Sequence, residues 1–163
     1  MRPKVLSPNI GLLKDAYAII DGIPDGVFDL HQIARQNAQL HHKNLNLYCG
    51  TIACAAGWLA LHPTFAASVR TVKTNYRGRI REIVWHDRQG NEFISYGNHD
   101  WAQGMAELFS LALRDTYTLF GARLNVTARY DEAILAENER ITDKQLWQAR
   151  VRKFIANHED NKY

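Results

Sequence analysis

Apolar residues recur every three or four positions in several stretches of the chain, which is the spacing of one face of an α-helix. The first stretch runs over residues 10–20, and the preceding Ser7-Pro8 pair predicts its start, with Ser as N-cap and Pro at the first helical position. The last stretch follows a predicted capping box of Thr142 and Gln145. The pattern predicts helices over residues 8–21, 29–38, 51–61, 98–113, 115–120, 127–138 and 142–158.

The predicted helix from Thr51 to Leu61 is apolar on nearly all sides, which is typical of a helix surrounded by protein. Its alanines and its glycine allow neighbouring elements to approach closely, and Pro63 ends it. We therefore expect this segment to be the buried central helix of the fold.

Residues 69–96 differ from the rest, because β-formers dominate and turn residues separate them. They predict strands over 69–74, 80–87 and 92–96, with a turn at residues 87–91. The expected fold is therefore α+β: a mostly helical single domain over residues 1–163, with a two- to three-stranded antiparallel β-meander.

The composition restricts the class of protein but does not indicate a function. The chain has 163 residues, a net charge of +3 and two cysteines, Cys49 and Cys54, too few for a disulfide scaffold. No signal peptide opens the chain and no stretch approaches the length of a membrane span, so we expect a protein of the reducing cytoplasm. No phosphate-cradling glycine loop or common hydrolase motif occurs, and no cofactor is predicted.

A thiol-dependent enzyme is one alternative, and whether the chain is an enzyme stays open. Cys49 precedes the predicted helix start, where orphan amides and the helix dipole favour a thiolate. The base could be His62, His86, His99 or His158, and the orienting carboxylate Asp29, Asp87 or Asp100. The pair His99-Asp100, at a predicted helix start, is the first to test. The structural alternatives are a cysteine packed as a small hydrophobe and a His99-Asp100 pair that only caps a helix.

A metal site is weighed and not predicted. Its candidate ligands are His41, His42, Cys49, Cys54 and His62. Zinc fingers use a short cysteine pair and a short histidine pair, and the spacing here matches neither.

Nucleic-acid binding is a further alternative, located in the predicted meander. Its candidate phosphate contacts are Arg70, Lys73, Arg77, Arg79, Arg81 and Arg88. Alternating charged and apolar residues are also what one solvated face of a sheet shows, so this pattern does not demand nucleic acid.

The run from Cys49 to Trp58 reads Cys-Gly-Thr-Ile-Ala-Cys-Ala-Ala-Gly-Trp, after Phe28-Asp29-Leu30 upstream. It resembles the Cys-Gly-Thr-x-x-Cys-x-x-Gly-Trp hallmark of a family of small phage and bacterial proteins that carry Phe-Asp-Met before it. The resemblance implies a phage or bacterial setting and no particular reaction. We therefore expect an accessory protein that acts by binding a macromolecular partner, a protein such as a host factor, with no membrane association.

Overall fold

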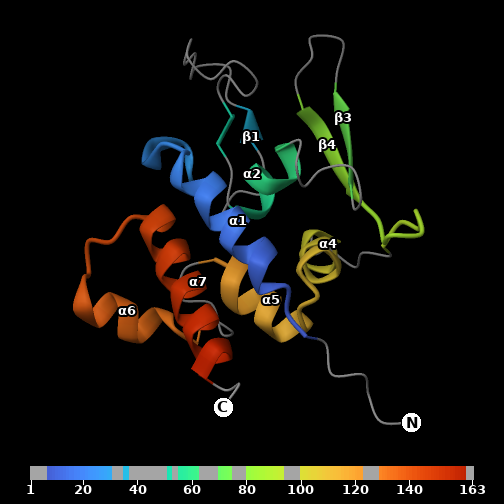
Figure 1. Cartoon of the computed structure of the whole chain (residues 1–163). Coiled ribbons are helices and arrows are strands. Elements are labelled where there is room, and N and C mark those ends of the chain that lie inside the picture. The colour runs from blue at the N-terminus through green and yellow to red at the C-terminus, as the bar shows by residue number, and fades with distance from the viewer. Residues whose placement is uncertain are drawn as a thin grey trace.

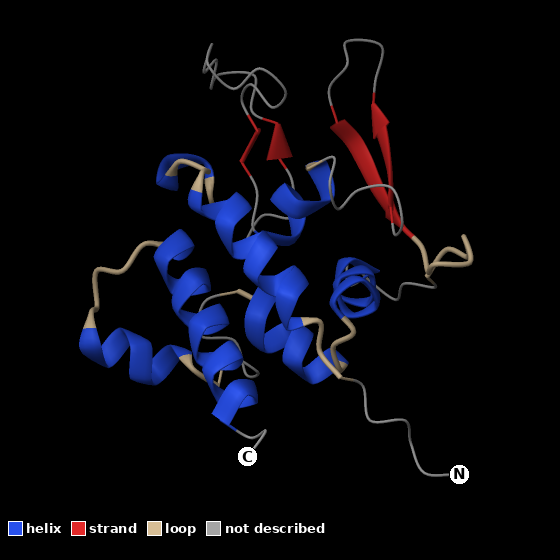
Figure 2. Cartoon of the chain, viewed as in Figure 1, coloured by secondary structure: helices blue, strands red, loops and turns tan. Residues whose placement is uncertain are grey.

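The computed structural model describes residues 7–30, 35–36, 51–52, 55–62, 70–74, 80–93, 100–122 and 129–160. Within these ranges the helices pack into one body, and the strands lie together at one end of it (Figures 1 and 2). None of the helices so described has the length and apolar character needed to cross a membrane.

The described helices are α1 (Ile10–Asp21), α2 (Ala55–Leu61), α4 (Asp100–Phe109), α5 (Leu113–Phe120), α6 (Asp131–Glu137) and α7 (Asp143–Asp160), with a 3₁₀ turn at Asp25–Val27. The described strands are β1 (Arg35–Gln36), β2 (Thr51–Ile52), β3 (Arg70–Thr74) and β4 (Ile80–Trp85).

The predicted α+β fold with a two- to three-stranded meander is wrong. The described part of the chain is mainly helical, and its strands form two separate ribbons, β1 with β2 and β3 with β4, both antiparallel. No described residue of the predicted strand 92–96 extends β3–β4 as a third strand, since Glu92 makes a single bridge to His86 and the described range ends at Phe93. Sequence propensity marks extended segments, but tertiary contacts decide how many of them pair.

The predicted helix 51–61 begins later than expected, at Ala55. Thr51 and Ile52 instead pair with Gln36 and Arg35. Both residues are β-branched, which favours the extended conformation once a partner strand is available. The same pairing contradicts the predicted helix 29–38. The helical part, α2, is buried at Trp58, whose Nε1 donates a hydrogen bond of 3.0 Å to the carbonyl of Val27.

The predicted helix 98–113 is interrupted at Ser110, which has a left-handed φ of 54°. The N–H of Leu111 then bonds to the carbonyl of Ala106 at 3.0 Å, which closes the end of α4 as a Schellman motif does. The next helix starts at Leu113 and not at residue 115. A serine in this conformation gives little sequence signal, because glycine is the usual residue there.

Capping hydrogen bonds explain where α7 starts and show that the predicted N-cap of α1 is wrong. The capping box is confirmed: the backbone N–H of Gln145 donates to Thr142 Oγ1 at 3.2 Å, and that of Thr142 donates to Gln145 Oε1 at 3.1 Å. The N-cap of α1 is Asn9 and not Ser7, because the Asn9 side chain accepts the Leu12 N–H at 3.0 Å. The described part of predicted helix 127–138 is helical from Asp131.

An aromatic cluster lies at the centre of the helical body. The rings of Phe109 and Phe120 stack with centroids 5.7 Å apart. The Trp147 ring lies 6.1 Å from Phe120 and 6.4 Å from Tyr17. These contacts join α1, α4, α5 and α7, and Phe109, Phe120 and Trp147 are among the largest fully buried side chains that the structure describes.

The β3–β4 ribbon is anchored to α4 by Trp85, which is 2% exposed. Its ring lies directly against Gly104: a Cβ there would come within 2.9 Å of the ring's Cδ2 and closer still to Cε3. Only glycine allows this approach, and the contact fixes the end of β4, and the turn that follows it, beside α4.

Candidate functional site

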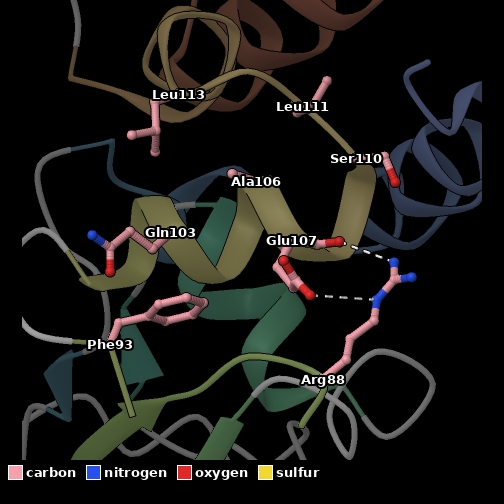
Figure 3. Close-up of a pocket in the computed structure, with 8 residues that line it drawn as sticks. All are labelled: Arg88, Phe93, Gln103, Ala106, Glu107, Ser110, Leu111 and Leu113. Carbon is pink, nitrogen blue, oxygen red and sulfur yellow. Dashed lines mark hydrogen bonds and ion pairs between the residues drawn. The ribbon is translucent and has the colours of Figure 1, made fainter. Parts of the chain in front are cut away.

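A cavity of about 420 Å³ opens between α4, the start of α5 and the segment that follows β4. We call it the α4 groove. Its lining residues are Arg88, Phe93, Gln103, Ala106, Glu107, Ser110, Leu111 and Leu113 (Figure 3). Cavities of this volume are large enough for a small molecule or for a few residues of another protein.

The turn at residues 87–91 carries Arg88, which lines the groove, and Asp87 holds this turn in shape. Asp87 Oδ1 accepts the backbone N–H groups of Asn91 at 3.0 Å and Gln89 at 2.9 Å. The Asn91 bond is the largest of several influences that lower the pKa of the Asp87 carboxyl, because these bonds favour its charged form. Gly90 supplies the left-handed backbone that the turn needs, with a φ of 87°.

An exposed ion pair closes one end of the groove. Arg88 donates from Nη2 to the backbone carbonyl of Glu107 at 3.0 Å, and its Nε lies 3.9 Å from the Glu107 carboxylate (Figure 3). The two side chains are 60% and 37% exposed, so solvent screening leaves the pair at most about 1 kcal/mol of stabilisation. Its role is geometric, because it holds the turn against α4.

The apolar part of the groove includes Phe93, Ala106, Leu111 and Leu113. Leu113 is the exposed large hydrophobic side chain of the described residues, with 49% of its surface open to solvent. It begins α5 immediately after the break at Ser110, so the break places this leucine at the edge of the cavity (Figure 3).

Gln103 supplies an unsatisfied polar group in the same groove. Its Oε1 is buried and accepts no hydrogen bond. A buried acceptor without a donor costs about 1–3 kcal/mol. Gln103 and Glu107 lie one helical turn apart on α4, so the groove carries two side-chain acceptors along one helix.

The sequence-predicted sites mostly fall outside the described residues. The residues that lie there entirely are Cys49, His99, Arg77, Arg79, Cys54, His41 and His42. Four further candidates belong to described helices or strands, but their side chains are outside the description: Asp100, Arg70, Lys73 and Arg81. Among the candidate phosphate contacts, Arg88 is the one whose side chain is described, and it contacts Glu107. The side chain of His62, a candidate metal ligand, is also described. Among the residues covered by the structure, no group of three or more His, Cys, Asp or Glu side chains is placed to hold a metal ion.

Sequence reasoning missed Gln103, Glu107 and Leu113. In an unbroken helix over residues 98–113, Leu113 would be one more residue of the apolar face, and Gln103 and Glu107 would belong to the solvated face of that helix. The available signal was the Ser110-Leu111-Ala112-Leu113 stretch, in which the apolar spacing departs from the helical period.

The fold and the groove together define a helical protein with an open, partly apolar surface cavity. Comparison of the chain with models of protein families, with curated proteins and with solved structures gives no match.

Proposed function

We propose that the chain is a non-catalytic accessory protein that binds a protein partner through the α4 groove. The observation that carries the proposal is Leu113, half-exposed beside a cavity whose walls are partly apolar. An apolar side chain next to a pocket is the usual arrangement of an interface anchor, because both surfaces leave water when a partner binds.

The resemblance of the Cys49–Trp58 run to phage and bacterial proteins supports a host protein as the partner. The cytoplasm, that of the host cell if the chain is phage-encoded, is then the proposed site of action. Among the residues that the structure describes, those that line the groove include an ion pair, an amide and a hydroxyl but no cysteine or histidine, which favours recognition over thiol chemistry at this place.

Photo-crosslinking in bacterial cells tests the proposal. A benzophenone amino acid at Leu113 should form a recurrent adduct with one protein, whereas the same group at Arg114 should not. Arg114 is the matched control, because it is the next residue of α5, is also exposed and does not line the groove.

The crosslinked protein is then purified and its affinity for the chain is measured directly. Full burial of a leucine contributes about 1.5–3 kcal/mol, so Leu113→Asp should weaken binding at least about tenfold, while Arg114→Ser should leave it unchanged. Absence of an adduct specific to Leu113, or equal affinity of the Leu113→Asp and Arg114→Ser variants, contradicts the proposal.

A further inference from the structure

We propose that the α4 groove receives an extended stretch of the partner's backbone, whose N–H groups donate to Gln103 Oε1 and to the Glu107 carboxylate. This inference rests on the proposed function, since it names the part of a protein partner that the groove recognises. It adds a hydrogen-bond specificity to the apolar contact made by Leu113.

Gln103 gives the groove an unpaired acceptor. Gln103 lines the cavity, and its amide leaves α4 on the side where Phe93 lies (Figure 3). Its Oε1 is buried and has no donor, so the proposed contact requires the side chain to rotate toward the cavity when an N–H binds. Binding of a donor therefore relieves a cost that the free protein carries.

The spacing of Gln103 and Glu107 along α4 matches that of the donors of an extended chain. Residues four apart on a helix are separated by about 6 Å along its axis, at a rise of about 1.5 Å per residue. Backbone N–H groups that point to the same side of an extended chain recur every second residue, about 6.6–6.8 Å apart. One extended segment lying along α4 therefore presents donors to Gln103 and Glu107 together, and its intervening side chain is free to meet the apolar wall.

A helical segment fits the same groove less well. All N–H groups of a helix beyond its first turn are already bonded within the helix, so its sides offer no backbone donors. Glu107 also favours a ligand that donates hydrogen bonds, because its carboxylate has more acceptor sites than Arg88 uses.

A second cavity provides a contrast. It has a volume of about 380 Å³ and lies between α1 and α7, with Lys14, Tyr17, Arg152 and Glu159 among its lining residues. Its polar groups are paired with one another, Lys14 with Glu159 at 2.8 Å and Arg152 with the Tyr17 hydroxyl at 2.5 Å. The α4 groove differs because it contains an acceptor that no described or neighbouring group satisfies.

The test compares two synthetic probes in titrations of the full-length, ¹⁵N-labelled protein followed by NMR. One is N-acetyl-Leu-Ala-Leu N-methylamide, and the other is its depsipeptide analogue, in which ester oxygens replace the backbone N–H groups. Both should perturb the Ala106 and Leu113 signals. Because two hydrogen bonds differ between the probes, the amide should bind at least about fivefold more tightly.

Two variants assign that preference to Gln103. Gln103→Met removes the acceptor while keeping an unbranched side chain, and it should lower the preference for the amide probe at least about threefold. Gln103→Glu keeps an acceptor at the same position and should retain the preference. Thermal unfolding curves establish that both variants fold.

The inference is overturned if the amide and the ester bind equally, if Gln103→Met keeps the full preference, or if neither probe perturbs α4. Equal binding of the two probes leaves the proposed function standing, because the groove still accepts apolar groups. Failure of the proposed function is recognised separately, by the absence of a Leu113-specific adduct in the crosslinking experiment.

Discussion

Arg150 and Asp131 form a bidentate ion pair in the interior of the protein. Arg150 Nε lies 2.7 Å from Asp131 Oδ1 and Nη2 lies 2.6 Å from Oδ2, and both side chains are fully buried. The same guanidinium donates to the carbonyls of Leu119, Gly121 and Ala122 at 3.3, 2.7 and 3.1 Å. Its donors are thereby fully used, and one side chain of α7 holds the end of α5 and the start of α6.

Replacement of either partner of this pair should destabilise the protein strongly. Asp131→Asn leaves a buried guanidinium without its counter-charge, and Arg150→Met removes the positive charge beside a buried carboxylate together with the guanidinium donors of three carbonyls. Each should lower the free energy of unfolding by about 3–5 kcal/mol, measured by urea denaturation. Arg152→Met, on the exposed side of α7, is the control and should cost less than about 1 kcal/mol. A loss below about 1 kcal/mol for both buried variants would contradict this role of the pair.

Gly104→Ala should destabilise the protein, although alanine is the better helix former. In most helix interiors this change stabilises by about 1 kcal/mol. Here the new Cβ would collide with the Trp85 ring, so the β3–β4 ribbon must shift, at a cost of about 1–3 kcal/mol.

The matched control for this change is Gly11→Ala in α1. The nearest atom to a Cβ there is Asn9 Oδ1 at an ordinary contact distance of 3.7 Å, so this variant should be stabilised. Denaturation curves and Trp fluorescence distinguish the two cases. Equal stabilisation by both alanines would mean that Trp85 does not pack on Gly104.

Acid should loosen the turn at residues 87–91, which carries the groove-lining Arg88. The N–H groups of Asn91 and Gln89 hold the pKa of the Asp87 carboxyl below its ordinary value of 3.8. A depressed pKa means that the stabilisation is fully present above the ordinary value and is lost as the pH falls through the lower, folded value.

An NMR titration of the Asp87 side chain measures this pKa, and amide exchange at Asn91 should accelerate in the same acid range. Asn91→Ala removes the side-chain contribution and should bring the pKa of Asp87 nearer to its ordinary value, with the backbone bonds still in place. An Asp87 pKa at or above the ordinary value would show that the turn does not bind the charged carboxylate.

The sequence by itself predicted those features that depend on neighbouring residues. The Thr142–Gln145 capping box is an interaction over three positions, and the hydrogen bonds expected from it are present. The turn at residues 87–91 is equally local, because Asp87 bonds only to residues within four positions of itself. Such interactions need no information about the rest of the fold, so spacing and residue type are sufficient to predict them.

Tertiary structure alone decided the features that depend on distant residues. Thr51 and Ile52 are extended because residues 35 and 36 lie beside them, and α4 ends at Ser110 in a conformation that serine rarely adopts. The α4 groove combines residues from the segment after β4 with residues from α4 and α5, so it depends on the packing between β4 and α4, where Trp85 lies against Gly104. The physical reason is that spacing along a chain specifies local periodicity, whereas a cavity is defined by which surfaces remain uncovered once all elements have packed.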